Sequence, residues 1–394
     1  MKIPPVMWTR TLARLLVLMG LLVAPLHVRA QKGVEFSPSD AHAVSVHAGN
    51  GIELQAKFNG QGPIDLIFDT GSANIMSASL AKKLGLTVAG TGRLDGGGGS
   101  VPAKGAMVDR VQIGGVTLRH QLFIVIDAPS GQVDDFAFVG DQWLQRLPVR
   151  IDFDRQRITF YNPRYFNPPS KDPFIPVHFE GNAVIGEASV DGIPALLVID
   201  TGSIYSLFLD SPFVKEHDLV HRYSATIQGY AGRGWGGAES GFYTRVDALQ
   251  FSSFTVKRPV AVLLDDTQGS GASHLAGIVG LRILKRFTLL FDCPTGRLYM
   301  EPSASYNKPD IFNRAGLVID ADQEQARIMM VIPHSPAAKA GLETGDIITQ
   351  IDGVAPTDAS LTNAFERPTG TRVRLTVVHS GAVRIVSCLL QDVL

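Results

Sequence analysis

The feature that most constrains the fold of this chain is a long internal repeat, which carries the tetrapeptide Asp-Thr-Gly-Ser twice. Residues 64–72 match residues 195–203, and each copy ends in that tetrapeptide. Further along both copies, two apolar residues precede a glycine, at 138–140 and again at 278–280. The matches keep the same order along the chain, so chance resemblance is a poor explanation. The sequence therefore predicts two lobes of one fold.

Each copy predicts a β-hairpin that leads into the tetrapeptide. Strand patterns over residues 52–58 and 64–68 flank an Asn-Gly turn, and those over 183–190 and 193–199 flank an Asp-Gly turn. Such dipeptides between apolar runs are strong hairpin signals. The lobes are therefore expected to be mainly β. Short helices are expected at residues 77–84, 141–146, 210–217 and 281–286.

Proline distribution divides the rest of the chain. Residues 161–176 contain five prolines, which predicts an extended connection between the lobes. A second junction falls near residues 302–309. The expected segments are a signal peptide at 1–30, a first lobe at 31–165, a second lobe at 166–305 and a tail domain at 306–394.

The N-terminus has the pattern of an export signal. Lys2, Arg10 and Arg14 precede the apolar stretch 15–26, and small residues follow up to Ala30. An apolar stretch of this length is short for a membrane span, although an uncleaved anchor is the alternative. We expect an exported protein, periplasmic or secreted after cleavage near Ala30.

Composition excludes several classes of function. The net charge is −1 and no Lys/Arg block occurs, which gives a nucleic-acid partner no electrostatic support. The 10 His show no metal-ligand spacing, so neither a metal nor a cofactor is expected. A Gly-x-Ser-x-Gly elbow is absent, which disfavours a serine hydrolase. Cys293 and Cys388 are expected to be free thiols, although an oxidising compartment would permit a bridge.

The two aspartates of the tetrapeptides, Asp69 and Asp200, suit metal-free peptide hydrolysis. Two carboxylates about a hydrogen bond apart cannot both ionise easily, so they share one proton. One can then take a proton from water while the other donates to the carbonyl oxygen. Neither lobe can do this alone, so the lobes must face each other across a pseudo-twofold axis.

The residues after each aspartate have predicted supporting roles. The threonines can join the two loops below the carboxylates, and the glycines allow a tight turn beside the partner loop. The serine hydroxyls can bond the outer oxygens of their own carboxylates. These residues are Thr70, Gly71, Ser72, Thr201, Gly202 and Ser203.

Hairpin, tetrapeptide and apolar-apolar-Gly triplet together resemble the retropepsin-like and pepsin-like aspartic peptidases. The resemblance covers residues 45–302, and the lobe lengths are nearer to retropepsin-type units. It implies two homologous acid-protease lobes, a catalytic pair at Asp69 and Asp200, a substrate cleft and a covering flap. The pepsin pattern would place an aromatic residue in the first flap, and residues 94–103 have none. The flap candidates are 94–103, with Gly97 and Gly98, and 228–240, with Tyr230 and Trp235.

The tail resembles PDZ domains, especially those attached to bacterial proteases. Its motif runs through Ser-Pro-Ala-Ala-Lys-Ala-Gly-Leu at 335–342 and Gly-Asp at 345–346, with a second helix expected at 358–365. By this resemblance, backbone N–H groups of one loop take a peptide's C-terminal carboxylate, and the peptide adds as a strand. The alternative is a tail that only packs against the lobes. The loop residues are Arg314, Ala315, Gly316, Leu317 and Val318, with Arg314 adding charge attraction.

These features predict an exported aspartic endopeptidase whose PDZ domain recruits or gates its substrates. The expected partners are peptides or unfolded proteins, and protein C-termini at the PDZ domain. A monomer is expected because one chain carries both aspartates. The competing hypothesis is a catalytically silent peptide-binding adaptor on the same fold.

Overall fold

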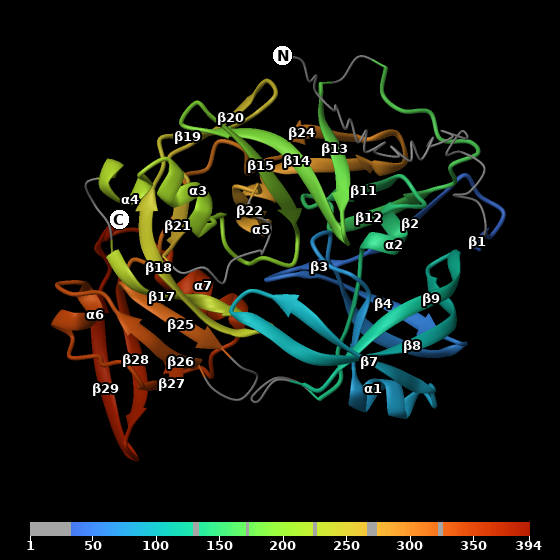
Figure 1. Ribbon diagram of the computed structural model, residues 1–394. Coiled ribbons are helices and arrows are strands. Elements are labelled where there is room, and N and C mark those ends of the chain that lie inside the picture. The colour runs from blue at the N-terminus through green and yellow to red at the C-terminus, as the bar shows by residue number, and fades with distance from the viewer. Residues whose placement is uncertain (1–32, 129–133, 171–172, 224–226, 266–273, 322–325) are drawn as a thin grey trace, which may run out of the picture.

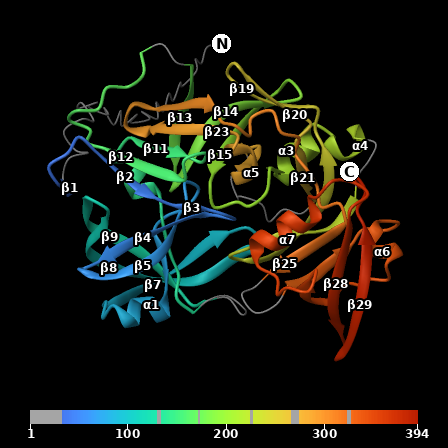
Figure 2. The ribbon, with the colours of Figure 1, turned by 180° about the vertical axis from the view of Figure 1, so that it is seen from behind.

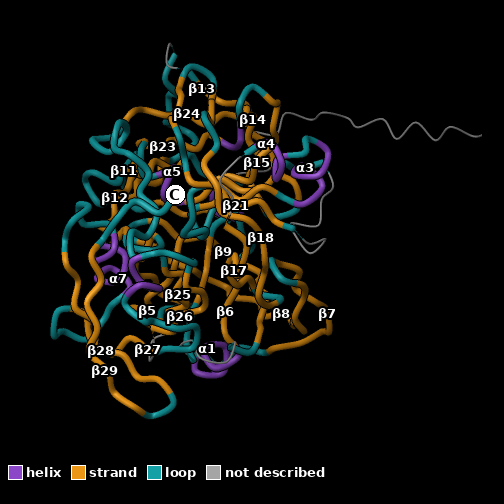
Figure 3. The backbone as a smooth tube through the Cα atoms, turned by 90° about the vertical axis from the view of Figure 1, so that its left-hand side faces the viewer, coloured by secondary structure: helices purple, strands orange, loops and turns teal. Residues whose placement is uncertain are grey.

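The computed structural model describes residues 33–128, 134–170, 173–223, 227–265, 274–321 and 326–394. Two β-rich lobes and a smaller β domain make up these residues (Figure 1). Strands run through all three parts and the helices are short (Figure 3), which confirms the mainly β prediction. The predicted signal peptide at 1–30 lies outside the described residues. Within these ranges, no helix is both long and apolar enough to cross a membrane.

The first lobe is one sheet in the order β1-β9-β6-β10-β5-β4-β8-β7, with β3 paired to β4. The predicted hairpin is β4 and β5, and residues of β4 alternate between buried and exposed as the sequence pattern requires. The elements of this lobe are β1 (Val34–Phe36), β3 (His47–Ala48), β4 (Ile52–Phe58), β5 (Gln61–Phe68), β6 (Ile75–Ser77), α1 (Ala78–Lys83), β7 (Val88–Gly96), β8 (Gly99–Ile113), β9 (Val116–Ile126), β10 (Ala137–Val139) and α2 (Asp141–Leu144).

The second lobe repeats this plan in the order β17-β18-β21-β16-β22-β15-β14. Its hairpin is β14 and β15, and α3 and α5 occupy the predicted helix positions. The elements are β14 (Ala183–Val190), β15 (Ile193–Asp200), β16 (Leu207–Leu209), α3 (Ser211–Glu216), α4 (Leu219–Arg222), β17 (Ile227–Gly234), β18 (Gly237–Arg245), β19 (Ala248–Phe251), β20 (Phe254–Lys257), β21 (Val260–Leu264), β22 (Gly277–Gly280) and α5 (Leu281–Leu284).

A shared sheet joins the lobes in the order β13-β24-β23-β11-β12-β2. Its central pair is β11 with β23, so the two halves of the repeat meet at the middle of the sheet. This arrangement fixes the lobes about a pseudo-twofold axis. The elements are β2 (Ala41–Ser45), β11 (Val149–Asp152), β12 (Arg157–Tyr161), β13 (Phe174–Glu180), β23 (Phe287–Asp292), a 3-10 turn (Cys293–Thr295) and β24 (Arg297–Pro302).

The apolar-apolar-Gly triplets form the strands that hold β5 and β15, the strands that lead to the two aspartates, in place. Within the triplets, β10 runs parallel to β5, and β22 runs parallel to β15, with Gly280 beside Asp200. The following helices α2 and α5 begin directly after the glycines. The repeat seen in the sequence is therefore a repeat of the strand, loop and helix around each aspartate.

The tail domain is a sheet in the order β25-β26-β27-β28-β29 with its own apolar core. Ser335 caps α6 by accepting from the Ala338 amide at 3.2 Å, as its Ser-Pro start predicts. Seen from behind, α7 lies on the side of the domain that faces the lobes (Figure 2). The elements are β25 (Leu317–Ala321), β26 (Ala326–Val331), α6 (Pro336–Lys339), β27 (Ile347–Ile351), α7 (Asp358–Phe365), β28 (Arg372–His379) and β29 (Ala382–Leu389). Cys293 and Cys388 are free thiols.

Candidate active site

Asp69 and Asp200 lie together where the two lobes meet. A Cβ added to Gly71 would lie 2.5 Å from Cγ of Asp200, and one added to Gly202 would lie 2.5 Å from Cγ of Asp69. Each carboxylate therefore rests directly on the glycine of the opposite loop, where no side chain fits. The two carboxyl groups also hydrogen-bond each other. The structure makes them one site.

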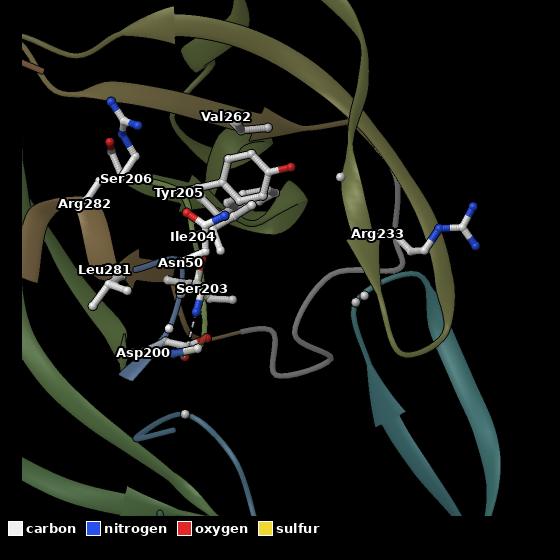
Figure 4. A pocket seen from close by; sticks show the side chains of 18 of the residues that line it. Asn50, Asp200, Ser203, Ile204, Tyr205, Ser206, Arg233, Val262, Leu281 and Arg282 are labelled. Atoms are coloured by element: carbon white, nitrogen blue, oxygen red, sulfur yellow. Dashed lines mark hydrogen bonds between the residues drawn. The ribbon is translucent and has the colours of Figure 1, made fainter. Parts of the chain in front are cut away.

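Backbone amides hold the carboxylates in place. Gly71 N donates to Oδ1 of Asp69 at 2.9 Å, and Gly202 N and Ser203 N donate to Oδ1 of Asp200 at 2.7 and 3.1 Å. Figure 4 shows Ser203 next to Asp200 at the base of the pocket. The structure does not give the serines their predicted contact, because the Ser72 hydroxyl donates to the Ala73 carbonyl at 3.1 Å. Ser203 contributes its amide, since the tight loop turns main-chain donors toward the carboxylate.

Below the carboxylates, Thr70 and Thr201 join the two loops. The Thr70 hydroxyl donates to the Ile199 carbonyl at 2.6 Å, and the Thr201 hydroxyl donates to the Phe68 carbonyl at 2.9 Å. Each hydroxyl also accepts the backbone N–H of the other threonine, at 3.0 and 3.1 Å. Both threonines are fully buried. These four bonds hold the two aspartates in register, because each one crosses from lobe to lobe.

The environment favours one shared proton. Burial, and then the charge of Asp200, raise the pKa of Asp69 well above its ordinary value. Burial also raises the pKa of Asp200, against the lowering effects of the Asp69 hydrogen bond and two loop amides. The two buried carboxyl groups therefore share one proton as a pair.

Two hairpins cover the site, and their tips meet. The lobe-one hairpin is β7 and β8, and the lobe-two hairpin is β17 and β18. Gly236 N donates to the Gly97 carbonyl at 2.9 Å. A Cβ on Gly98 would lie 2.5 Å from the Gly237 carbonyl carbon, so only glycines allow this approach. The sequence left open which flap closes, and the structure closes both against each other.

The lobe-two flap also reaches across to lobe one through Trp235. Its ring lies 5.8 Å from the Phe136 ring and 5.5 Å from the Phe138 ring. Tyr230, the other aromatic flap candidate, lies farther back and donates its hydroxyl to Asp320 of the tail domain at 3.3 Å. The flap without an aromatic residue is thus covered by the aromatic residue of its partner.

Beneath the flaps is a cavity of about 1250 Å³. Its lining includes both aspartates, the flap residues Gly97 and Trp235, and Tyr205. Figure 4 shows Tyr205 above Asp200, below the strand that carries Val262. A cavity of this size accommodates an extended peptide segment.

Comparison with known proteins agrees with this geometry. Residues 54–138 match the family model described as aspartyl protease, and residues 327–378 match the model described as PDZ domain. The chain contains a retropepsin-like aspartyl protease domain and a PDZ domain. No curated protein matches the chain.

Solved structures that match include an aspartic proteinase from Irpex lacteus, with 13% sequence identity and a TM-score of 0.44, covering 68% of this chain and 99% of that one. They also include a retropepsin-like aspartic protease from Rickettsia conorii, with 18% identity and a TM-score of 0.24, covering 32% of this chain and 92% of that one.

The predicted carboxylate loop of the PDZ domain is already occupied by its own groups. Oδ1 of Asn313 accepts from Ala315 N at 3.0 Å and from Leu317 N at 3.5 Å. Gly316 N donates to the Asn313 carbonyl, and Val318 packs with residues of the lobe-two flap. Arg314 is bound to Asp392 at 2.8 Å and to the carbonyl groups that end α7, so its charge is already paired.

Sequence reasoning missed two residues that line the cavity and one buried residue that packs behind the first aspartate loop. Tyr205 lies two residues beyond the tetrapeptide, Phe138 belongs to the apolar triplet, and Asp141 follows the glycine of that triplet. The Asp141 amide donates to the Ser72 carbonyl at 3.3 Å, and burial raises the pKa of its carboxyl to about 6. Its position beside the repeated triplet was the available signal.

Replacing Trp235 by Ala is expected to raise KM about tenfold, because two aromatic contacts between the flap and lobe one are lost. The kcat value should change less, since Trp235 does not touch the carboxylates. Steady-state kinetics on one fluorogenic peptide measures both. Trp235→Phe, which keeps an aromatic ring at the same place, is the matched control. An unchanged KM in Trp235→Ala would contradict the anchoring role.

Proposed function

We propose that this protein is an exported aspartic endopeptidase that hydrolyses peptide bonds with a water activated between Asp69 and Asp200. The observation that carries the proposal is the hydrogen-bonded, buried pair of carboxyl groups, each held by amides of the loops. Such a pair, sharing one proton, supplies a base and an acid at one point.

The proposed reaction uses the two aspartates in different roles. Ionised Asp200 takes a proton from the water while the water oxygen bonds to the carbonyl carbon of the substrate. At the same time Asp69 gives its proton to the carbonyl oxygen. The resulting diol then collapses: Asp200 returns its proton to the amide nitrogen, the C–N bond breaks, and a diol proton returns to Asp69. Atoms and protons balance, and no cofactor enters.

The flaps and the PDZ domain have supporting roles in this proposal. The joined flaps would exclude water and hold the substrate backbone near the pair. The PDZ domain would recruit or gate peptide substrates, which would be unfolded or extended chains. One chain carries both aspartates, so the proposed enzyme works as a monomer. The basic and apolar N-terminal sequence supports export, and sequencing the N-terminus of the mature protein would test cleavage near Ala30.

The rate at which residues 31–394 hydrolyse an unfolded protein is expected to show a bell-shaped dependence on pH. Activity falls as pH rises through the pKa of Asp69, because the acid loses its proton. It falls again as pH drops through the pKa of Asp200, because the base gains one. Since burial raises both pKa values, the bell lies at higher pH than for an exposed pair.

Measurement of kcat/KM across acidic to neutral pH checks this expectation. Asp141→Asn is the control, because burial raises the pKa of this nearby carboxyl to about 6. Titration of Asp141 would then produce one side of the pH profile by itself. The bell should keep both limbs in Asp141→Asn. Absence of cleavage at every pH, with peptide binding intact, would favour a silent adaptor instead.

A further inference from the structure

The cavity under the flaps does not end with the protease lobes. Its lining continues from Asp69 and Asp200 into the groove between β25 and α7 of the PDZ domain. The groove is therefore open to the catalytic cleft. The groove residues that line the same cavity are Leu317, Val318, Ile319, Leu361, Thr362 and Phe365.

The PDZ domain is firmly attached beside the second lobe. Arg282, in the helix α5 that follows the strand beside Asp200, pairs with Asp310 at 3.4 Å and with Glu366 at 2.6 Å. Glu366 is the residue that ends α7, and Asp310 is nearly fully buried. A contact this well paired fixes the groove relative to the carboxylates. A peptide in the groove consequently has a defined position relative to the site of hydrolysis.

The far end of β25 meets the lobe-two flap. Asp320 accepts the hydroxyl of Tyr230 at 3.3 Å and pairs with Arg233 at 3.4 Å. Figure 4 shows Arg233 on the flap hairpin that closes over the pocket. A strand that follows β25 therefore arrives at the flap, whose Gly232 lies against the Tyr205 ring near the catalytic loop.

The groove offers main-chain pairing and apolar contacts, and its carboxylate loop is already in use. Among the described strands, β25 pairs only with β26, so its other edge is open. An extended peptide can add to such an edge. The loop amides that would take a terminal carboxylate donate to Asn313, and the charge of Arg314 is paired with Asp392.

We infer that the PDZ groove is an extension of the substrate cleft, and that one extended polypeptide pairs with β25 while the same chain is cut between Asp69 and Asp200. The preferred substrates are long, unfolded, apolar segments, recognised without a free C-terminus. This inference rests on the proposed peptidase function and adds a substrate class to it.

Peptide length gives the main test. β25 has five residues, so a paired segment of about 16 Å, at ~3.3 Å per residue, adds roughly five residues to those around the cut bond. We would compare a fluorogenic peptide of about six residues with apolar extensions of about eight residues on either side, each as free acid and as amide. The extension on one side should raise kcat/KM about tenfold or more, equally for acid and amide.

A groove variant separates this inference from a general preference for long peptides. Thr362→Arg places a bulky charge in the groove, and Asn363→Arg places the same residue on the exposed face of the same helix. Thr362→Arg should remove the gain from the extension and leave cleavage of the short peptide unchanged. Asn363→Arg should leave both unchanged.

Three results would overturn the inference: no gain with length, a gain that Thr362→Arg retains, or a gain confined to free acids. In each of them, cleavage of the short peptide that depends on the aspartates would leave the peptidase proposal standing. If no peptide is cut, anisotropy of the labelled long amide on the Asp69→Asn protein still tests the groove. The Asp69→Asn protein is compared with the double variant that also carries Thr362→Arg. Tenfold weaker binding to the double variant supports the inference, and equal binding refutes it.

Discussion

Replacing either Asp69 or Asp200 by Asn is expected to reduce peptide hydrolysis about a thousandfold or more, because the shared proton and the base disappear together. The two substitutions should give similar losses, since neither carboxyl group can work without the other. The double variant should be little worse than either single one. Single-turnover cleavage of a labelled unfolded protein, followed at the optimum pH, measures the loss.

Stability provides the check on this result. The aspartates are buried together with raised pKa values, so replacing one carboxyl group by a neutral amide should leave the unfolding temperature unchanged or higher. Asp65→Asn is the matched control: it is the same substitution in β5, the strand that leads into Asp69, at an exposed residue bonded to Gln55. Full activity in Asp69→Asn or Asp200→Asn would remove the dyad from the mechanism. A loss equally large in Asp65→Asn would mean that the assay reports folding.

Local features of the fold were predictable because they depend on neighbouring residues. Turn dipeptides and alternating patterns predicted both hairpins, and Ser77 predicted the start of α1, whose Leu80 amide it caps at 3.1 Å. The tetrapeptide repeat predicted two matching lobes, and the threonine bonds between loops follow from their symmetry. The repeated sequence segments therefore form the same strand, loop and helix in both lobes.

Contacts between distant segments were not predictable in this way. That both flap tips meet depends on how the lobes are joined, and this is set by the shared sheet around β11 and β23. The contact of Trp235 with Phe136 and Phe138 depends on the same arrangement. The position of the PDZ groove beside the cleft depends on Arg282, which no pattern in the sequence distinguishes from an exposed arginine.

The glycine of the apolar triplet shows most clearly how far prediction from the sequence reaches. The sequence marks Gly140 and Gly280 as repeated, without a reason for glycine. In the structure, a Cβ on Gly140 would lie 2.7 Å from the carbonyl carbon of Asp69 and closer still to its oxygen. A Cβ on Gly280 would lie 2.8 Å from the carbonyl oxygen of Ser203. Each glycine is required because the loop that carries the aspartate packs directly on it.

Gly140→Ala is therefore expected to lower the free energy of unfolding by about 3 kcal/mol or more and to reduce hydrolysis about a hundredfold. The expected cost comes from the contact with Asp69, whose carbonyl group occupies the space that the added Cβ needs. Relief of that contact must move the Asp69 backbone, and a shift of about 1 Å between reacting groups suffices for such a loss of rate. Urea unfolding and kcat measure the two effects.

Gly92→Ala separates the contact from the general effect of replacing glycine. Its Cβ would meet only the Ala103 carbonyl oxygen, at 3.9 Å, so stability should change little. If Gly140→Ala were as stable as Gly92→Ala, the close packing of the triplet on the Asp69 loop would be refuted. If it were unstable yet fully active, the loop would tolerate the shift, and the position of Asp69 would depend on Thr70 and the facing lobe alone. A joint loss of stability and rate is expected because the same carbonyl group limits the packing and positions the carboxylate.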